Sequence, residues 1–168
     1  AVSTTTFSSI GKYDGTFKET KETSGIGSSP NISGGFLDVG DGLNDVQVLS
    51  ILHFDTSSLP DNAVITGVRL QIKRYRIIGS NPFTALGNLL VDVTSPFFGA
   101  EMTLKSSDFQ APASAANAGF FNTSPLPSNW FEAILQSGAF SSLNTGGTTQ
   151  FRLRFALEDN DDMHNNLF

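Results

Sequence analysis

The amino-acid sequence predicts an all-β protein, an antiparallel β-sandwich or jelly roll with long packed loops. Seven or eight short segments alternate apolar and polar side chains between turn-forming residues, as the strands of such folds do. No segment keeps the periodicity of a helix over any length. A hydrophobic content of 39%, a charged content of 15% and 15 Phe residues indicate a core built on aromatic side chains. At 168 residues, we expect one sandwich domain over residues 12–168, preceded by an N-terminal arm or edge strand over residues 1–11.

The best-defined part of the predicted sandwich is a strand, a turn and a second strand. Residues 48–54 (VLSILHF) are apolar on nearly both faces, which is typical of a central buried strand. Residues 55–62 combine short side chains that bond their own backbone with a proline that fixes φ, so they predict a turn. Residues 64–72 then alternate, and one face of this strand should lie on the core. His53, in the first strand, is interpreted as a hydrogen-bonded residue of the sheet rather than as a catalytic base.

The other predicted elements are shorter or less regular. We expect further strands at residues 12–22, 36–39, 89–94, 130–135 and 149–157. An acidic glycine loop should occupy residues 40–45. Residues 95–129 are irregular but rich in Phe, so we expect packed loops there, and residues 137–143 fit one helical turn.

The last strand has the clearest alternation of all. Its apolar residues should point into the core: Phe151, Leu153, Phe155 and Leu157. Its polar residues should point into water: Gln150, Arg152 and Arg154.

Charge and composition argue against several classes of function. A formal net charge of −6 and a pI near 4.7 argue against nucleic-acid binding, which needs a basic face. No apolar run approaches the roughly 20 residues that span a bilayer, so we expect no membrane insertion. The chain has no Cys and none of the familiar hydrolase, zinc-protease or nucleotide motifs. We therefore predict that the protein is not an enzyme; a carboxylate pair for glycoside hydrolysis is the alternative that spacing alone leaves open.

Two acidic loops could hold a structural calcium ion, because calcium takes several hard oxygen ligands from flexible loops. The candidate ligands of the first loop are Asp38, Asp41, Asn44 and Asp45. The second acidic loop covers residues 158–162 (EDNDD) together with Asn165 and Asn166, and its named candidate ligands are Asp159 and Asp161. Neither loop has the ligand spacing of an EF-hand. The alternative is that these side chains are solvated turn residues, and we predict no required cofactor.

A sugar-binding surface needs a flat aromatic side chain beside hydrogen-bonding groups. Tyr75 falls on the polar side of its strand between Arg74 and Arg76, which would suit an acidic polysaccharide. Trp130 is the second candidate platform. The alternatives are a solvated strand face at Tyr75 and a core position for Trp130. Two sequons would carry glycans if the source glycosylates such sites, and they begin at Asn31 and Asn122.

Several of these segments also resemble a known family. The stretch F-D-T-S-S-L-P at residues 54–60, set between two alternating strands, resembles the signature of DNRLRE-type domains. Residues 13–15 (YDG), 37–41 (LDVGD) and 151–155 (FRLRF) resemble other steps of that pattern, and the match spans about residues 13 to 168. Such domains are bacterial extracellular β-sandwich modules classed with carbohydrate-binding modules. The resemblance implies a secreted or cell-surface protein.

The sequence departs from the family pattern at one place. The family pattern continues past an Asp/Asn-rich turn into F-Y-S-G-D and a last strand, whereas this sequence stops at Phe168. A sandwich without that strand should expose an unpaired edge beside residues 149–157, open to strand addition from a neighbour. The arm of residues 1–10 is a candidate donor. Truncation of the sequence is the alternative explanation.

Together these observations predict a non-catalytic extracellular structural or adhesive module, a building block of a cell-surface protein, fibre or filament. Its expected partners are copies of itself or neighbouring domains. The alternative function is a carbohydrate-binding module that recognises an extracellular polysaccharide.

Overall fold

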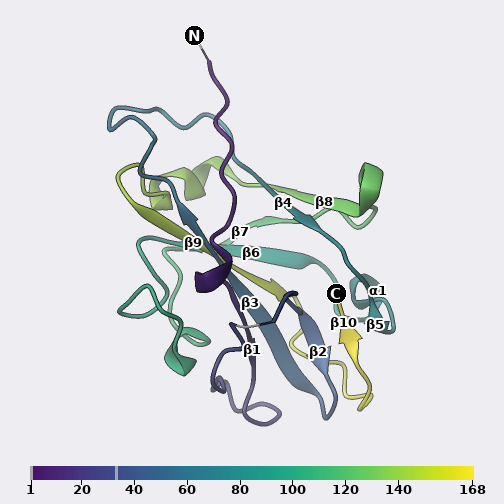
Figure 1. Ribbon diagram of the computed structural model, residues 1–168. Coiled ribbons are helices and arrows are strands. Elements are labelled where there is room, and N and C mark those ends of the chain that lie inside the picture. The colour runs from purple at the N-terminus through teal and green to yellow at the C-terminus, as the bar shows by residue number, and fades with distance from the viewer. Residues whose placement is uncertain (1, 33) are drawn as a thin grey trace.

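The computed structural model describes residues 2–32 and 34–168 and arranges antiparallel strands in two sheets (Figure 1). The larger sheet contains β1 (Gly15–Lys18), β2 (Gly40–Gly42), β3 (Val46–Asp55), β5 (Ile78–Gly79), β6 (Leu89–Thr94), β7 (Ala115–Phe120), β9 (Thr148–Phe155) and β10 (Asn166–Leu167). The smaller sheet pairs β4 (Arg69–Lys73) with β8 (Trp130–Ile134). The predicted all-β antiparallel sandwich is therefore confirmed.

The helices are short and lie between strands. Helix α1 spans Pro82–Ala85. Single 3₁₀ helices cover Gly11–Tyr13, Ser106–Asp108, Pro127–Asn129 and Ser137–Ser142, the last of which is the helical turn expected from the sequence. Within the described residues, no helix has both the length and the apolar character that crossing a membrane requires.

Strand β3 is the centre of the larger sheet, and it is buried on both faces as its composition predicts. Val48 pairs with β1 and with β2, and Ser50 pairs with β1 and with β9. Strands β2 and β9 therefore lie on the same side of β3, β2 along its first half and β9 along its second half. His53 is 1% exposed and its Nδ1 lies 3.2 Å from the amide nitrogen of Gln150, which confirms that it is a hydrogen-bonded residue of the sheet.

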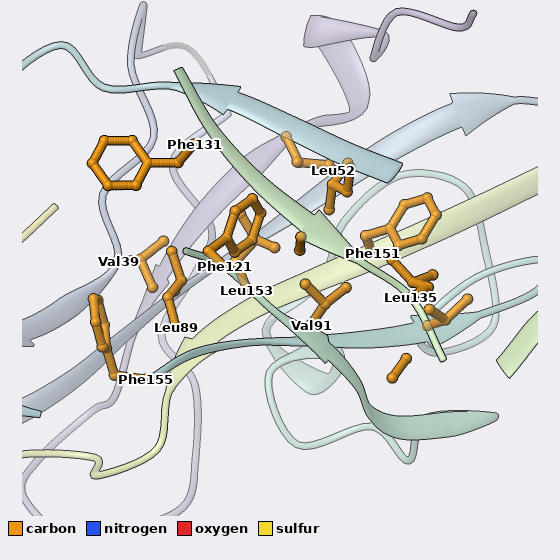
Figure 2. Packing of buried hydrophobic residues seen from close by; sticks show 14 of the residues in the cluster. Val39, Leu52, Leu89, Val91, Phe121, Phe131, Leu135, Phe151, Leu153 and Phe155 are labelled. Atoms are coloured by element: carbon orange, nitrogen blue, oxygen red, sulfur yellow. The ribbon is translucent and has the colours of Figure 1, made fainter. Parts of the chain in front are cut away.

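The main core lies between the two sheets. Figure 2 shows Phe131 and Leu135, from β8 and the residue after it, facing side chains of β6 and β9. The buried members contributed by β6 and β9 are Leu89, Val91, Val93, Phe151, Leu153 and Phe155. Burying an aromatic or aliphatic side chain of this size contributes about 1.5–3 kcal/mol. The core positions predicted in the last strand are confirmed up to Phe155, whereas Leu157 is 55% exposed.

A second core covers the opposite face of β3. Leu49 and Ile51 of β3 and Phe17 of β1 pack against apolar residues of the loop 95–114. Those loop residues are Phe98, Leu104, Phe109 and Ala111, all buried. The expected packed loops are thus present. However, residues 115–120 form β7, a strand that could not be predicted because Ala, Asn and Gly have low β propensity.

The expectation that the polar residues of β9 point into water is wrong for two of them, because the same loop covers them. Gln150 is fully buried and Arg152 is 9% exposed, because residues 95–114 cover that face. The Arg152 guanidinium donates to Asp92 Oδ2 and to the carbonyl oxygens of Phe109 and Ala111 over 2.7 to 3.1 Å. A strand arginine therefore holds the covering loop in place.

Two other expectations about the larger sheet are wrong. The strand predicted at residues 36–39 lies instead at Gly40–Gly42, inside the expected glycine loop. The free edge expected beside β9 is filled within the chain, because β9 pairs with β3 on one side and with β6 on the other. Strand β10 lies between β2 and β5. By contrast, β4 pairs with β8 along one edge, and the described residues place no strand along its other edge.

Residues 2–10 form no regular structure, and most of them are exposed. The arm meets the domain where the Ile10 N–H donates to the carbonyl oxygen of His53 over 2.8 Å. Figure 1 shows the N-terminal segment projecting away from the sheets.

Candidate functional site

One candidate site is the surface of the smaller sheet that faces away from the core, here called the outer face. Leu70 of β4 and Phe131 and Ala133 of β8 are buried, so the residues between them point outward. These outward residues are Arg69, Gln71 and Lys73 on β4 and Trp130, Glu132 and Ile134 on β8. The register opposes Lys73 to Trp130 and Gln71 to Glu132. The outer face is thus a strip of polar and aromatic side chains on two paired strands.

Tyr75 lies two residues beyond the end of β4. Its side chain is 66% exposed and stacks on Phe36, with ring centroids 4.0 Å apart and an interplanar angle of 14°. This contact fixes the Tyr75 ring against the segment that precedes β2. Trp130 is 39% exposed. Both predicted aromatic platforms are therefore accessible to solvent, and the core alternative for Trp130 is wrong.

The outer face and its border are basic in an acidic protein. Four of the chain's 10 Lys and Arg side chains fall within residues 69–76: Arg69, Lys73, Arg74 and Arg76. Arg76 lies 5.9 Å from the ring centroid of Tyr75, and Arg74 lies 5.5 Å from that of the core residue Phe131. Glu132 accepts a hydrogen bond from Gln71 over 2.8 Å and contacts Arg69 at 3.4 Å. Glu132 is thus neutralised locally, and the surrounding field favours an anion.

A second group of side chains lies beside β10 and is acidic. Carboxylate oxygens of Asp41, Asp45 and Asp162 lie within 4.8 Å of one another. Asp41 belongs to β2, Asp45 to the turn between β2 and β3, and Asp162 to the loop that leads into β10. Asp45 Oδ1 also accepts the N–H of Met163 over 2.8 Å, which ties the turn to that loop. These three carboxylates could hold a hard cation.

Polar atoms at this acidic group lack partners. Asp41 is fully buried, yet neither carboxylate oxygen has a hydrogen-bond partner. Asn166, which is opposite Asp41 in the β10–β2 pairing, is also fully buried, and its Oδ1 has no partner either. Among the described residues, no other buried side-chain nitrogen or oxygen is left without one. A buried polar atom without a hydrogen-bond partner costs free energy of folding, and the three such atoms that the described residues contain all lie in this acidic group.

The pKa of Asp41 also shows that its buried carboxylate is not compensated by its surroundings. Burial, followed by the charge of Asp45, raises the pKa of Asp41 to about 7. The backbone N–H of Asn160 opposes this rise, although it does not reach hydrogen-bonding geometry with the Asp41 carboxylate. Asp162 is different, because the backbone N–H of His164 donates to it and holds its pKa below the ordinary value.

The predicted metal ligands are partly brought together. Asp41 and Asp45 meet, and they are joined by Asp162, which belongs to the second acidic loop predicted from the sequence but is not one of its two named ligands. Within the described residues, three of the predicted acids lie outside the group: Asp38, Asp159 and Asp161. Asn44 is an exposed turn residue with a φ of 72°. The spacing indicates two separate loops, and only the pairing of β10 with β2 shows that they meet.

The two sequons differ in their surroundings. Asn122 is half-buried; its Oδ1 accepts the N–H of Glu132 over 2.7 Å, and its Nδ2 donates to the carbonyl of Ser124. A glycan on Nδ2 would compete with the second bond. Asn31 is exposed, and Ser33, which completes its sequon, lies outside the described residues.

Comparison with known proteins found no relative of this chain. No protein-family model, no curated protein and no solved structure matches this chain. The resemblance to DNRLRE-type domains therefore stays a prediction from the motifs quoted above.

Proposed function

We propose that this chain is a non-catalytic extracellular adhesive module that binds an acidic polysaccharide through the outer face of the β4–β8 sheet. One observation carries the proposal: an exposed Tyr75 ring, held by Phe36, stands in a stretch that contains four of the chain's 10 basic side chains. Sugar rings stack on flat aromatic side chains, and acidic sugars add carboxylates that Arg and Lys bind.

The arrangement of the outer face suits a linear polymer. Lys73 is opposite Trp130 in the register, and Tyr75 follows Lys73 two residues later in the chain. A chain of sugars that runs from Tyr75 onto the outer face would meet one aromatic ring first and then the opposed pair of Lys73 and Trp130. The motif resemblance to modules classed with carbohydrate-binding modules supports the same proposal.

The effect of Tyr75 on binding tests the proposal. The wild-type protein is expected to bind polygalacturonate, an acidic polysaccharide, and not neutral dextran. Tyr75→Ala should weaken the binding by about tenfold, because the aromatic platform is lost. Isothermal titration calorimetry at low ionic strength measures the affinities of the wild type and of Tyr75→Ala for each polysaccharide. Raising the salt concentration should weaken the binding, because the charges are then screened.

Phe120→Ala is the matched control, since Phe120 is an aromatic residue on β7 with 55% of its side chain exposed. It should bind polygalacturonate as the wild type does. Equal binding to dextran, or equal losses in Tyr75→Ala and Phe120→Ala, would contradict the proposed face.

Structural assembly by strand addition is the second candidate function. The observation that favours it is the edge of β4 that no described strand covers, together with the exposed arm of residues 2–9. An uncovered edge presents unpaired N–H and C=O groups to an extended segment. The arm of a neighbouring copy, which carries Thr4, Thr5 and Thr6, has the β propensity that such a segment needs.

Light scattering on the chain with and without residues 1–10 tests this assembly. Oligomers or fibres that become monomers when the arm is removed would support strand exchange. A monomer in both cases would rule out the arm as donor.

A further inference from the structure

We propose that Asp41, Asp45 and Asp162 bind one calcium ion, with Oδ1 of Asn166 as a further ligand. The ion would fasten β10 and the loop before it to β2 and the β2–β3 turn. This site is separate from the outer face, and its existence does not depend on polysaccharide binding.

The distances permit a single shared ion. Calcium lies about 2.3–2.6 Å from its oxygen ligands, so two ligands of one ion are at most about 5 Å apart. The three aspartates satisfy that limit, since one carboxylate oxygen from each lies within 4.8 Å of the other two. The pairing of Asn166 with Asp41 in neighbouring strands adds an amide oxygen from β10.

The unpartnered atoms provide the independent evidence for a ligand. Both carboxylate oxygens of Asp41 and Oδ1 of Asn166 are buried without a hydrogen-bond partner. The amide nitrogen of Asn166 is oriented by Asp162 Oδ1 at 3.5 Å and by the carbonyl oxygen of His164 at 3.2 Å. Its oxygen, in contrast, is available. A bound cation would satisfy all three orphaned oxygens at once.

The type of ligand favours calcium over other divalent ions. All the proposed ligands are oxygens of Asp and Asn, the kind of ligand that calcium prefers; two come from the short strands β2 and β10 and two from the turn and the loop beside them. His164 is exposed, and its Nδ1 lies 3.7 Å from Asp162, outside the buried part of the group. Zinc would favour nitrogen or sulfur ligands, and magnesium demands a tighter octahedral arrangement than a turn and a loop supply.

The ion would connect segments that are far apart in the sequence. Two hydrogen bonds already place the loop against the turn: the N–H of Met163 donates to Asp45, and the N–H of Leu43 donates to Oδ1 of Asn165 over 2.9 Å. Neither bond neutralises the acidic charge. Without an ion, the repulsion among the three carboxylates works against the attachment of β10; with an ion, the same carboxylates hold it.

Calcium titration of the chelator-treated full chain tests the site. Calorimetry should show one calcium per chain, and saturating calcium should raise the Tm by about 5 °C or more. Magnesium should bind at least about tenfold more weakly. No calcium binding up to about 10 mM, a concentration beyond the range of extracellular calcium modules, or equal affinity for magnesium, would overturn the proposal.

Three variants with the same charge change separate the site from the general acidity of the loop. Asp41→Asn should lose calcium binding while remaining folded in calcium-free buffer, because it removes a buried, unpaired charge. Asp161→Asn, in the same loop as Asp162 but outside the group, should bind calcium as the wild type does. Asp162→Asn, whose side chain is 40% exposed, repeats the test at a position where folding is less sensitive. Equal losses in Asp161→Asn and Asp162→Asn would contradict the assigned ligands.

Discussion

Replacing Asp92 with alanine is expected to lower the free energy of unfolding by about 3–5 kcal/mol, because it leaves two arginines without their shared partner. Asp92 is fully buried on β6 and accepts hydrogen bonds from Arg152 and Arg154 over 2.9 to 3.2 Å. It also accepts the N–H of Asn117 over 2.9 Å. Arg152 would then be a nearly buried cation beside the carbonyls that hold the loop 95–114. Urea denaturation measures the change.

Glu101→Ala is the control for this variant. Glu101 forms an exposed pair with Lys105 at 3.6 Å, and such pairs contribute about 0–1 kcal/mol. If both variants changed the stability by the same small amount, the buried network would not hold the loop in the way described.

The pH dependence of stability should follow from the same carboxylate. Burial alone would raise the pKa of Asp92, but the hydrogen bond and charge of Arg154, the Asn117 N–H and the charge of Arg152 outweigh it and hold the pKa below the ordinary value. The stabilisation from ionised Asp92 is therefore fully present above its pKa in the unfolded chain. It is lost as the pH falls through its pKa in the folded protein, and Asp92→Ala should lose this acid-sensitive component.

Gly79→Ala is expected to displace β10 and to cost about 3 kcal/mol or more of stability. A Cβ at Gly79 would lie 1.6 Å from the carbonyl oxygen of Asn165, and the φ of +77° disfavours any L-residue there. Gly40, on the other side of β10, is equally restricted: its φ is +143°, and a Cβ would lie 2.0 Å from the carbonyl oxygen of Asn166. Close backbone approach on both sides therefore depends on glycine.

Hydrogen exchange at Asn166 and Leu167, together with urea denaturation, measures this effect. Gly79→Ala should lose protection at both amides and weaken calcium binding, since Asn166 moves with the strand. Gly67→Ala is the control, because no atom lies within 4 Å of a Cβ placed there. Unchanged protection in Gly79→Ala would show that β10 does not need the close approach.

The fold could be predicted where side-chain alternation is strong. Strand β6 occupies the predicted residues 89–94, and β3 is buried on both faces as its composition indicates. Strand β2 could not be predicted in place, because Gly40 and Gly42 are poor strand formers. At Gly40 the close approach of the Asn166 backbone requires glycine. The burial of Arg152 could not be predicted either, since alternation shows which face of a strand a residue occupies but not what covers that face.

The candidate sites divide in a similar way. The outer face could be anticipated in part, because the alternation of Arg69, Gln71 and Lys73 is visible in the sequence, whereas Tyr75 lies beyond the end of β4. The acidic group could be anticipated only in part. Asp41 and Asp45 lie in a loop that suggests a ligand, whereas Asp162 and Asn166 reach them through the pairing of a two-residue strand, β10. No local pattern specifies that pairing.

A titration with soluble oligogalacturonate, followed by two-dimensional NMR on chelator-treated protein, tests the proposed function most directly. Removing calcium first prevents the ion from crosslinking the acidic sugar. The account predicts that the backbone amides that shift most belong to the outer face: Gln71, Lys73, Tyr75, Trp130 and Glu132. Shifts absent from these residues, or larger at basic residues elsewhere such as Lys12, Lys18 and Lys21, would contradict the proposal that the β4–β8 sheet binds the polysaccharide.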